Sequence, residues 1–115
     1  MNVLIIHRQP SFLKRIKEKF SLGGWDVQTA KCGLEALLTA RHRHFDLMLC
    51  GFDLPMVSGT EVIRSTRLLS VNTNVSVYFL MEGSELEELI DLGRRLDGNM
   101  IDEQEIESFG KLACL

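Results

Sequence analysis

The chain has 115 residues, of which 45% are hydrophobic and 25% are charged. This length and composition fit one compact domain over residues 1–115 and argue against a disordered or membrane-embedded chain. The formal net charge of -3 excludes a broad electrostatic attraction to nucleic acid, although Arg41 to His44 form a local basic cluster.

The cysteines and the amino-terminal segment predict where the protein works. Cys32, Cys50 and Cys114 have neither CxxC spacing nor the density of a secreted disulfide scaffold. The apolar run at residues 3–6 is too short to span a membrane and lacks the flanks of a signal peptide. We therefore expect a cytoplasmic protein with reduced thiols and no membrane contact.

Short apolar runs alternate along the chain with longer amphipathic segments. This alternation is typical of a parallel sheet whose strands are joined by crossover helices. Five strands are predicted, at residues 3–6, 25–29, 46–50, 75–80 and, more weakly, 99–101.

The first two helices are predicted from apolar residues at helical spacing. One begins at Pro10, a favourable first-turn residue, and ends at the Gly23-Gly24 pair. The residues that mark the helices are Phe12, Leu13, Ile16 and Phe20 in the first and Leu34, Leu37 and Leu38 in the second.

Three later helices are predicted from residue pairs with the spacing of a capping box. In each pair, a residue that can cap the helix precedes a glutamate by three positions, and an apolar stripe follows. The pairs are Ser58 with Glu61, Ser84 with Glu87, and Asp102 with Glu105, and the stripe of the last helix is Ile106, Phe109, Leu112 and Ala113.

The predicted order of elements is that of a doubly wound α/β domain. Strand and helix alternate five times, and right-handed crossovers place helices on both faces of the sheet. We predict a three-layer α/β/α domain with a five-stranded parallel sheet of flavodoxin-like strand order 2-1-3-4-5. Ligands of such sheets bind at the carboxyl ends of the strands near the switch point, here residues 7–10 and 51–55.

The sequence resembles the receiver (CheY-like) domains of bacterial response regulators over nearly its whole length. The segments in register are VLIIHRQPSFLKRI, WDVQTAKCGLEALL, FDLMLCGFDLPMVSGTEVIR and VSVYFL. The most specific stretch runs from Asp46 to Gly59, where it resembles the family's third strand, phosphoacceptor and proline-containing loop. The resemblance implies the same fold and a role in two-component or phosphorelay signalling.

The family's phosphorylation chemistry uses five positions, and this sequence departs from the family at every one. The acidic pair that holds a divalent cation is matched by His7 and Arg8, and the nucleophilic aspartate by Gly51. The hydroxyl residue that ends the fourth strand is matched by Met81, and the lysine that ends the fifth by Asp102.

These departures predict a degenerate phosphorylation pocket. Glycine has no carboxylate to take up phosphate, and imidazole and guanidinium groups repel Mg²⁺ rather than bind it. Asn99 stands where the family's switch aromatic is expected. The resemblance thus implies a pseudoreceiver that is not an enzyme, uses no cofactor or metal, and acts by phosphorylation-independent contacts with a protein partner, either a second copy or another signalling protein.

Alternative functions stay open at this point. Asp53, two residues beyond Gly51, would be the acceptor of an atypical receiver, but without metal-binding acids it lacks electrostatic stabilisation for phosphoryl transfer. A flavodoxin-like ligand-binding domain or enzyme shares the architecture, but no glycine-rich phosphate cradle or HExxH motif is present. Direct DNA binding would need a basic face or a helix-turn-helix, and neither is evident.

The resemblance also indicates a surface for partners. Receivers dimerise or bind partners through the fourth helix, fifth strand and fifth helix, here Ser84 to Leu112. The candidate residues of this face are Leu86, Glu87, Ile90, Arg94, Met100 and Ile106.

The charges of the degenerate pocket are inverted relative to the family. Arg8 stands where an acid is expected, and Asp102 stands where the lysine is expected. We expect Arg8 to reach past Gly51 toward Asp102 or Asp53, because its planar fork binds carboxylates in two places. A solvated strand end without a task is the alternative interpretation.

Overall fold

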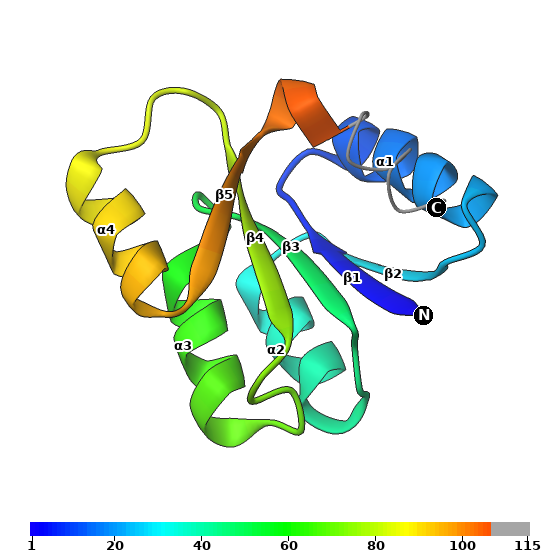
Figure 1. Cartoon of the computed structure of the whole chain (residues 1–115), viewed down its shortest axis with the longest axis horizontal. Coiled ribbons are helices and arrows are strands. Elements are labelled where there is room, and N and C mark those ends of the chain that lie inside the picture. Colours follow the sequence, from blue (N-terminus) through cyan, green and yellow to red (C-terminus); the bar gives the residue numbers. More distant parts are fainter. Residues whose placement is uncertain (107–115) are drawn as a thin grey trace.

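One parallel sheet of five strands, in the order β2-β1-β3-β4-β5, forms the centre of the molecule, here a computed structural model that describes residues 1–106 (Figure 1). The predicted strand order is confirmed, and so are all five strands, with bounds that differ from the prediction by one residue. The strands are β1 (Asn2–Ile6), β2 (Asp26–Ala30), β3 (Leu47–Gly51), β4 (Ser76–Met81) and β5 (Gly98–Asp102).

The two strands β1 and β3 are buried on both faces, which explains why their sequences are continuous apolar runs. Helices cover both faces of the sheet, so that side chains on either face of β1 and β3 are buried, from Val3 to Ile6 and from Leu47 to Gly51. β1 pairs with β2 on one side and with β3 on the other. The switch point of the topology therefore lies where the carboxyl ends of β1 and β3 meet.

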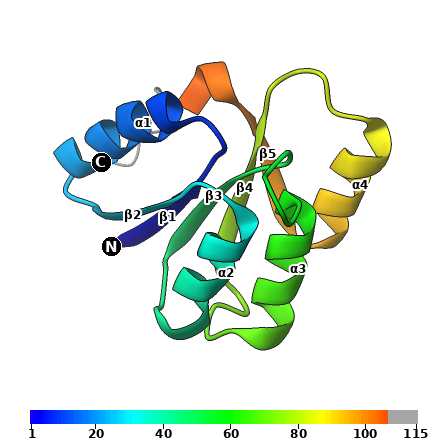
Figure 2. The same ribbon diagram turned by 180° about the vertical axis from the view of Figure 1, so that it is seen from behind.

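Within residues 1–106, four α-helices form the outer layers. α1 (Pro10–Leu22) lies on one face of the sheet, and α2 (Gly33–His42), α3 (Gly59–Leu69) and α4 (Glu87–Arg95) lie on the other (Figures 1 and 2). Each face has its own apolar core. The α1 side is built around Phe12, Ile16, Phe20, Val3 and Ile5, and the opposite side around Ala36, Ile63, Phe79, Leu4 and Met48.

The predicted ends of α1 and the predicted start of α3 are confirmed. Pro10 opens α1, and Gly23 caps it, followed by Gly24 with a positive φ of 87° that glycine adopts without strain. At the start of α3, the Ser58 hydroxyl oxygen accepts a hydrogen bond from the Glu61 backbone N–H at 3.3 Å.

Two predicted caps are wrong. Ser84 does not cap α4: the helix begins after Leu86, and the Glu85 carboxylate accepts hydrogen bonds from the N–H groups of Glu82 and Gly83 in the preceding loop. Asp102 ends β5 and makes no side-chain cap, and a short 3₁₀ turn, Glu103–Glu105, follows it. The predicted stripe of the last helix beyond Ile106 lies outside the described residues.

Helix α2 forms as predicted but packs through its small side chains. Gly33, Ala36 and Ala40 are buried, and a Cβ atom at Gly33 would lie 2.5 Å from the Val57 carbonyl oxygen. The helix can approach the sheet and the loop after β3 this closely only with small residues on its inner side. Leu34 and Leu38 are consequently exposed, whereas Leu37 is half-buried against the core.

Candidate functional site

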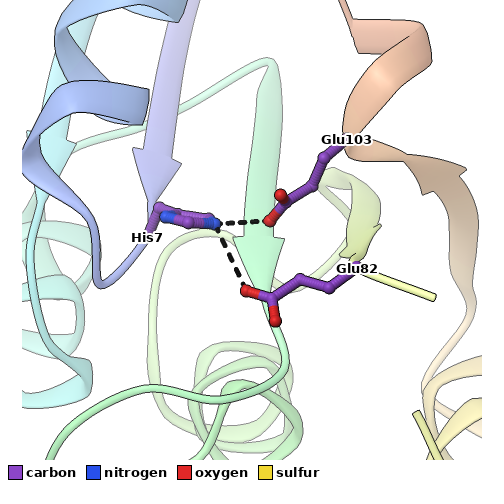
Figure 3. Close-up of side chains that lie close together, drawn as sticks. All are labelled: His7, Glu82 and Glu103. Atoms are coloured by element: carbon purple, nitrogen blue, oxygen red, sulfur yellow. Dashed lines mark hydrogen bonds and ion pairs between the residues drawn. The ribbon is translucent and has the colours of Figure 1, made fainter. Parts of the chain in front are cut away.

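A buried histidine stands at the carboxyl end of β1. The His7 ring stacks on Phe12 with 4.1 Å between ring centroids, and only 1% of the residue is exposed. Its Nδ1 accepts a hydrogen bond from the Gln9 N–H at 3.1 Å, and its Nε2 lies 2.5 Å from a carboxylate oxygen of Glu103 (Figure 3). The Gln9 donor places the proton of the neutral ring on Nε2, which therefore donates to Glu103.

Arg8 forms the second polar contact of this edge. Its Nη2 donates to both carboxylate oxygens of Glu82, at 2.7 and 2.9 Å, and its Nε lies 3.7 Å from Asp53 Oδ2. Both side chains of the Arg8–Glu82 pair are about one-third exposed, at 34% and 29%. Water therefore screens this bridge partly, and its contribution to stability is modest.

The predicted bridge from Arg8 to Asp102 is wrong. Asp102 is exposed and forms no ion pair within residues 1–106, whereas the predicted approach of Arg8 to Asp53 is confirmed as an ion pair. Distance across the sheet does not decide this, because the neighbouring His7 contacts Glu103, which directly follows β5. Glu82, directly after β4, is instead the acid that the Arg8 guanidinium contacts.

Glu82 and Glu103 are the residues of this site that sequence reasoning missed. Each directly follows a pocket position, Met81 or Asp102, at the end of a strand. Carboxyl ends of neighbouring parallel strands share one edge of the sheet, so acids at these positions had to lie near residues 7 and 8. The placement of an acid directly after the last residue of each strand was the sequence signal that could have identified them.

The remaining predicted pocket positions, Gly51, Met81, Asn99 and Asp53, have different surroundings. Gly51 ends β3 in a buried position, yet a Cβ there would meet only ordinary contacts, with His7 Cδ2 at 3.6 Å, so the glycine is not required by a tight passage of the backbone. Met81 is half-buried and packs on the core. Asn99 donates to the Val77 carbonyl at 3.3 Å, and the Asp53 side chain is 85% exposed.

Cys50 lies beside Gly51 but is part of the core. Its Sγ is 3.4 Å from the Gly51 carbonyl oxygen, and the side chain is fully buried. Burial raises the pKa of the Cys50 thiol, because the thiolate would lose its hydration. The group therefore stays protonated and is not a nucleophile.

The site does not fit the Mg²⁺ ion that the fold family uses. His7, Glu82 and Glu103 are the one group in residues 1–106 whose ligand atoms come together as a metal site would require, within 4.8 Å of one another (Figure 3). The Nε2 proton of His7, fixed by the Gln9 donor, points at the place a metal would take. A ligating histidine instead donates from its other nitrogen. Arg8 adds a positive charge 2.7 Å from Glu82.

The residues of the candidate interaction face differ in exposure. Leu86, Glu87 and Arg94 are exposed on α4 or just before it, and Ile90 and Met100 are half-buried. Ile106 is wrong as a member of this face, because it is 1% exposed and belongs to the core on the α1 side of the sheet. None of the helices within residues 1–106 is long and apolar enough to cross a membrane.

Comparison with known proteins gives the class of this fold and site. No family model matches the chain. The polar-differentiation response regulator DivK of Brucella ovis is 31% identical over 88 residues, which are 73% of this chain and 72% of DivK. The sensor protein EvgS of Escherichia coli O157:H7 is 27% identical over 88 residues, 76% of this chain but 7% of EvgS.

A solved structure agrees with the sequence comparison. The chemotaxis protein CheY4 of Vibrio cholerae has a TM-score of 0.82 to this chain and covers 97% of both chains at 19% identity, which shows the common fold. Together with the similarity to DivK, this defines a doubly wound receiver. The chain belongs to the response-regulator receiver (CheY-like) family of two-component signalling.

Proposed function

We propose that this receiver domain acts by phosphorylation-independent binding to a signalling partner. The observation that carries the proposal is the set of residues at the switch point, where Gly51 supplies no carboxylate. The positions that would hold the cation are instead occupied by His7 and Arg8, each already bound to an acid of the same chain. Such a site offers neither the nucleophile nor the metal ligands of aspartyl phosphorylation.

The positions that would transmit phosphorylation also support a constitutive state. Met81, in place of the hydroxyl residue, packs against the core and has no hydroxyl to move toward a phosphate. Asn99, in place of the aromatic, is held by the Val77 carbonyl. A ligand shifts an equilibrium only through different affinities for two states, and these residues offer phosphate no such difference.

Phosphorylation at Asp53 is the weaker alternative. Its carboxylate is mostly solvated, and its charged neighbour is Arg8 Nε at 3.7 Å rather than a pair of metal-binding acids. Phosphoryl transfer relies on such electrostatic stabilisation of the transferred group. Asp53 therefore lacks the surroundings that would make it reactive.

The proposed contact surface for this function is the exposed side of α4 with the adjoining strand β5. Leu86, 65% exposed, stands at the start of the helix between charged side chains that include Glu87. Arg94 lies two turns farther along the helix and is exposed too. An apolar anchor with charges on its rim is a common composition of protein interfaces.

Capture of partners from an extract of the native cell tests the proposed function. The immobilised domain is expected to retain the same partner with and without acetyl phosphate and Mg²⁺. Glu87→Lys and Arg94→Glu should each weaken capture at unchanged melting temperature, because both side chains are exposed. Lys17→Glu, on the opposite face of the sheet, is the matched control. Capture that requires the phosphodonor, or that neither α4 variant weakens, would contradict the proposal.

A further inference from the structure

Helix α2 turns apolar side chains toward solvent. Leu38 is 63% exposed and Leu34 is 44% exposed, whereas the inner side of the helix is formed by a glycine and two alanines. These two leucines lie one turn apart, and a large part of each side chain is not covered by the described chain. Each would gain free energy by burial against another surface.

The exposed apolar side chains continue from α2 onto the neighbouring helix α3. A shallow cavity of about 370 Å³ separates the two helices, lined by residues that include Leu37, Arg41, Ser65 and Leu69. Figure 2 shows α2 and α3 side by side on the same face of the sheet. Half of the ten large apolar residues exposed in residues 1–106 lie on these helices or just after α3: Leu34, Leu38, Leu68, Leu69 and Val71.

Opposite charges stand at the two ends of the exposed side of α2. Glu35 lies in its first turn and Arg41 in its last, and both are exposed. Neither side chain has an ion-pair partner within residues 1–106. Glu35 lies three residues before Leu38 and Arg41 three residues after it, so the charges are disposed symmetrically about this leucine.

We propose that a second copy of this chain docks on the α2–α3 face, with the two α2 helices antiparallel and a two-fold axis passing near Leu38. In this arrangement Leu38 meets its own counterpart, and Glu35 of one chain faces Arg41 of the other, twice over. An isologous contact requires such self-complementarity of one patch. The apolar residues supply the burial, and the two ion pairs fix the direction of the helices.

Self-association accounts for this surface better than a partner with charge of a single sign. An acidic helix would pair with Arg41 but oppose Glu35, and a basic helix would do the reverse. Only a partner that carries both signs in the opposite order satisfies both ends, and a second copy of α2 has this pattern. The proposal does not depend on the α4–β5 surface, which stays free in the dimer.

Sedimentation equilibrium of the full chain tests the proposal. The average mass should rise with concentration from 13.1 kDa toward twice this value. Leu38→Glu should hold the protein at monomer mass, while Leu22→Glu, at an exposed position on α1, should leave association unchanged. Glu35→Arg and Arg41→Glu should each raise the dissociation constant roughly tenfold, because each places like charges opposite one another at both symmetric contacts. The double variant should restore association, because it brings opposite charges together again.

Oxidative crosslinking tests the position of the axis without relying on affinity. In a Cys32→Ser, Cys114→Ser background, Leu38→Cys should form a disulfide-linked dimer, because residues on a two-fold axis lie opposite their own copies. Leu22→Cys should not form this dimer. A chain that stays monomeric at millimolar concentration would overturn the proposal, as would a dimer that Leu38→Glu does not dissociate or a double charge variant that fails to recover.

Discussion

Two buried polar side chains, Asn72 at the amino ends of the strands and His7 at their carboxyl ends, are satisfied in different ways. At the amino ends of β3 and β4, Asn72 accepts a hydrogen bond from the Phe45 N–H at 2.7 Å. Its amide nitrogen donates to the carbonyls of Ala40 and Arg43 at 2.7 and 2.8 Å. At the carboxyl edge, His7 donates to the side chain of Glu103. One residue is held by backbone groups, and the other by a carboxylate.

The kind of partner distinguishes residues that maintain the fold from residues at the family's signalling positions. Backbone partners are present whatever the neighbouring residues are, so Asn72 joins the loops at the amino edge as part of the fold. Side-chain partners depend on residue identity, and every departure from the family's catalytic positions lies at the carboxyl edge, where doubly wound sheets place their chemistry. New pairs, His7 with Glu103 and Arg8 with Glu82, fill that edge. Under the proposed function, the fold is retained while the reactive groups are exchanged.

The largest expected effect is at the amino edge. Asn72→Ala removes three hydrogen bonds at once and leaves buried backbone groups without partners. We expect the free energy of unfolding to fall by about 2 to 4 kcal/mol in urea denaturation. Asn74→Ala, two residues on and exposed, is the matched control and should change it by about 0.5 kcal/mol or less. Equal effects of the two variants would show that the side-chain hydrogen bonds of Asn72 do not stabilise the fold as described.

At the carboxyl edge, His7→Ala should have a smaller effect. The variant loses the stack on Phe12 and the bond to Glu103, and we expect a loss of about 1 to 3 kcal/mol in the same assay. Glu103→Gln keeps an oxygen that accepts from Nε2 and should cost less than His7→Ala. A Glu103→Gln variant less stable than His7→Ala would show that the charge of Glu103, rather than its hydrogen bond, dominates.

The smallest expected effect is the coupling between Arg8 and Glu82. A double-mutant cycle with alanine should give a coupling energy of about 0.5 to 1 kcal/mol that declines with added salt, because the pair is partly solvated. A parallel cycle of Arg8 with Asp102 should be additive within about 0.5 kcal/mol. Coupling to Asp102 in place of Glu82 would contradict the arrangement of this edge.

Local sequence patterns predicted most of the fold. Apolar runs located all five strands within one residue, because buried strands must be apolar on both faces. The cap at Ser58 was predictable because it is satisfied within four residues. Ser84 failed as a cap because α4 begins only after Leu86, and capping-box spacing does not reveal that the Glu85 side chain instead binds the loop N–H groups of Glu82 and Gly83.

The candidate site was less predictable because its contacts are distant in the chain. The bonds of Arg8 to Glu82 and of His7 to Glu103 join residues 74 and 96 positions apart. No local pattern encodes which acid a cation selects among several at one sheet edge. The outward leucines of α2 were likewise hidden, because helical spacing identifies a stripe without saying which side of the helix the core takes.

The intact mass of the protein after incubation with acetyl phosphate and Mg²⁺ tests the central claim most directly. With Gly51 at the acceptor position and the cation positions closed by His7 and Arg8, we expect the mass to stay unchanged. A receiver domain that has the family's acceptor aspartate, incubated in parallel, shows that the phosphodonor is active. Stoichiometric phosphate on this chain that disappears in Asp53→Ala would contradict the account, because it would show that phosphorylation had moved two residues along the loop rather than been lost.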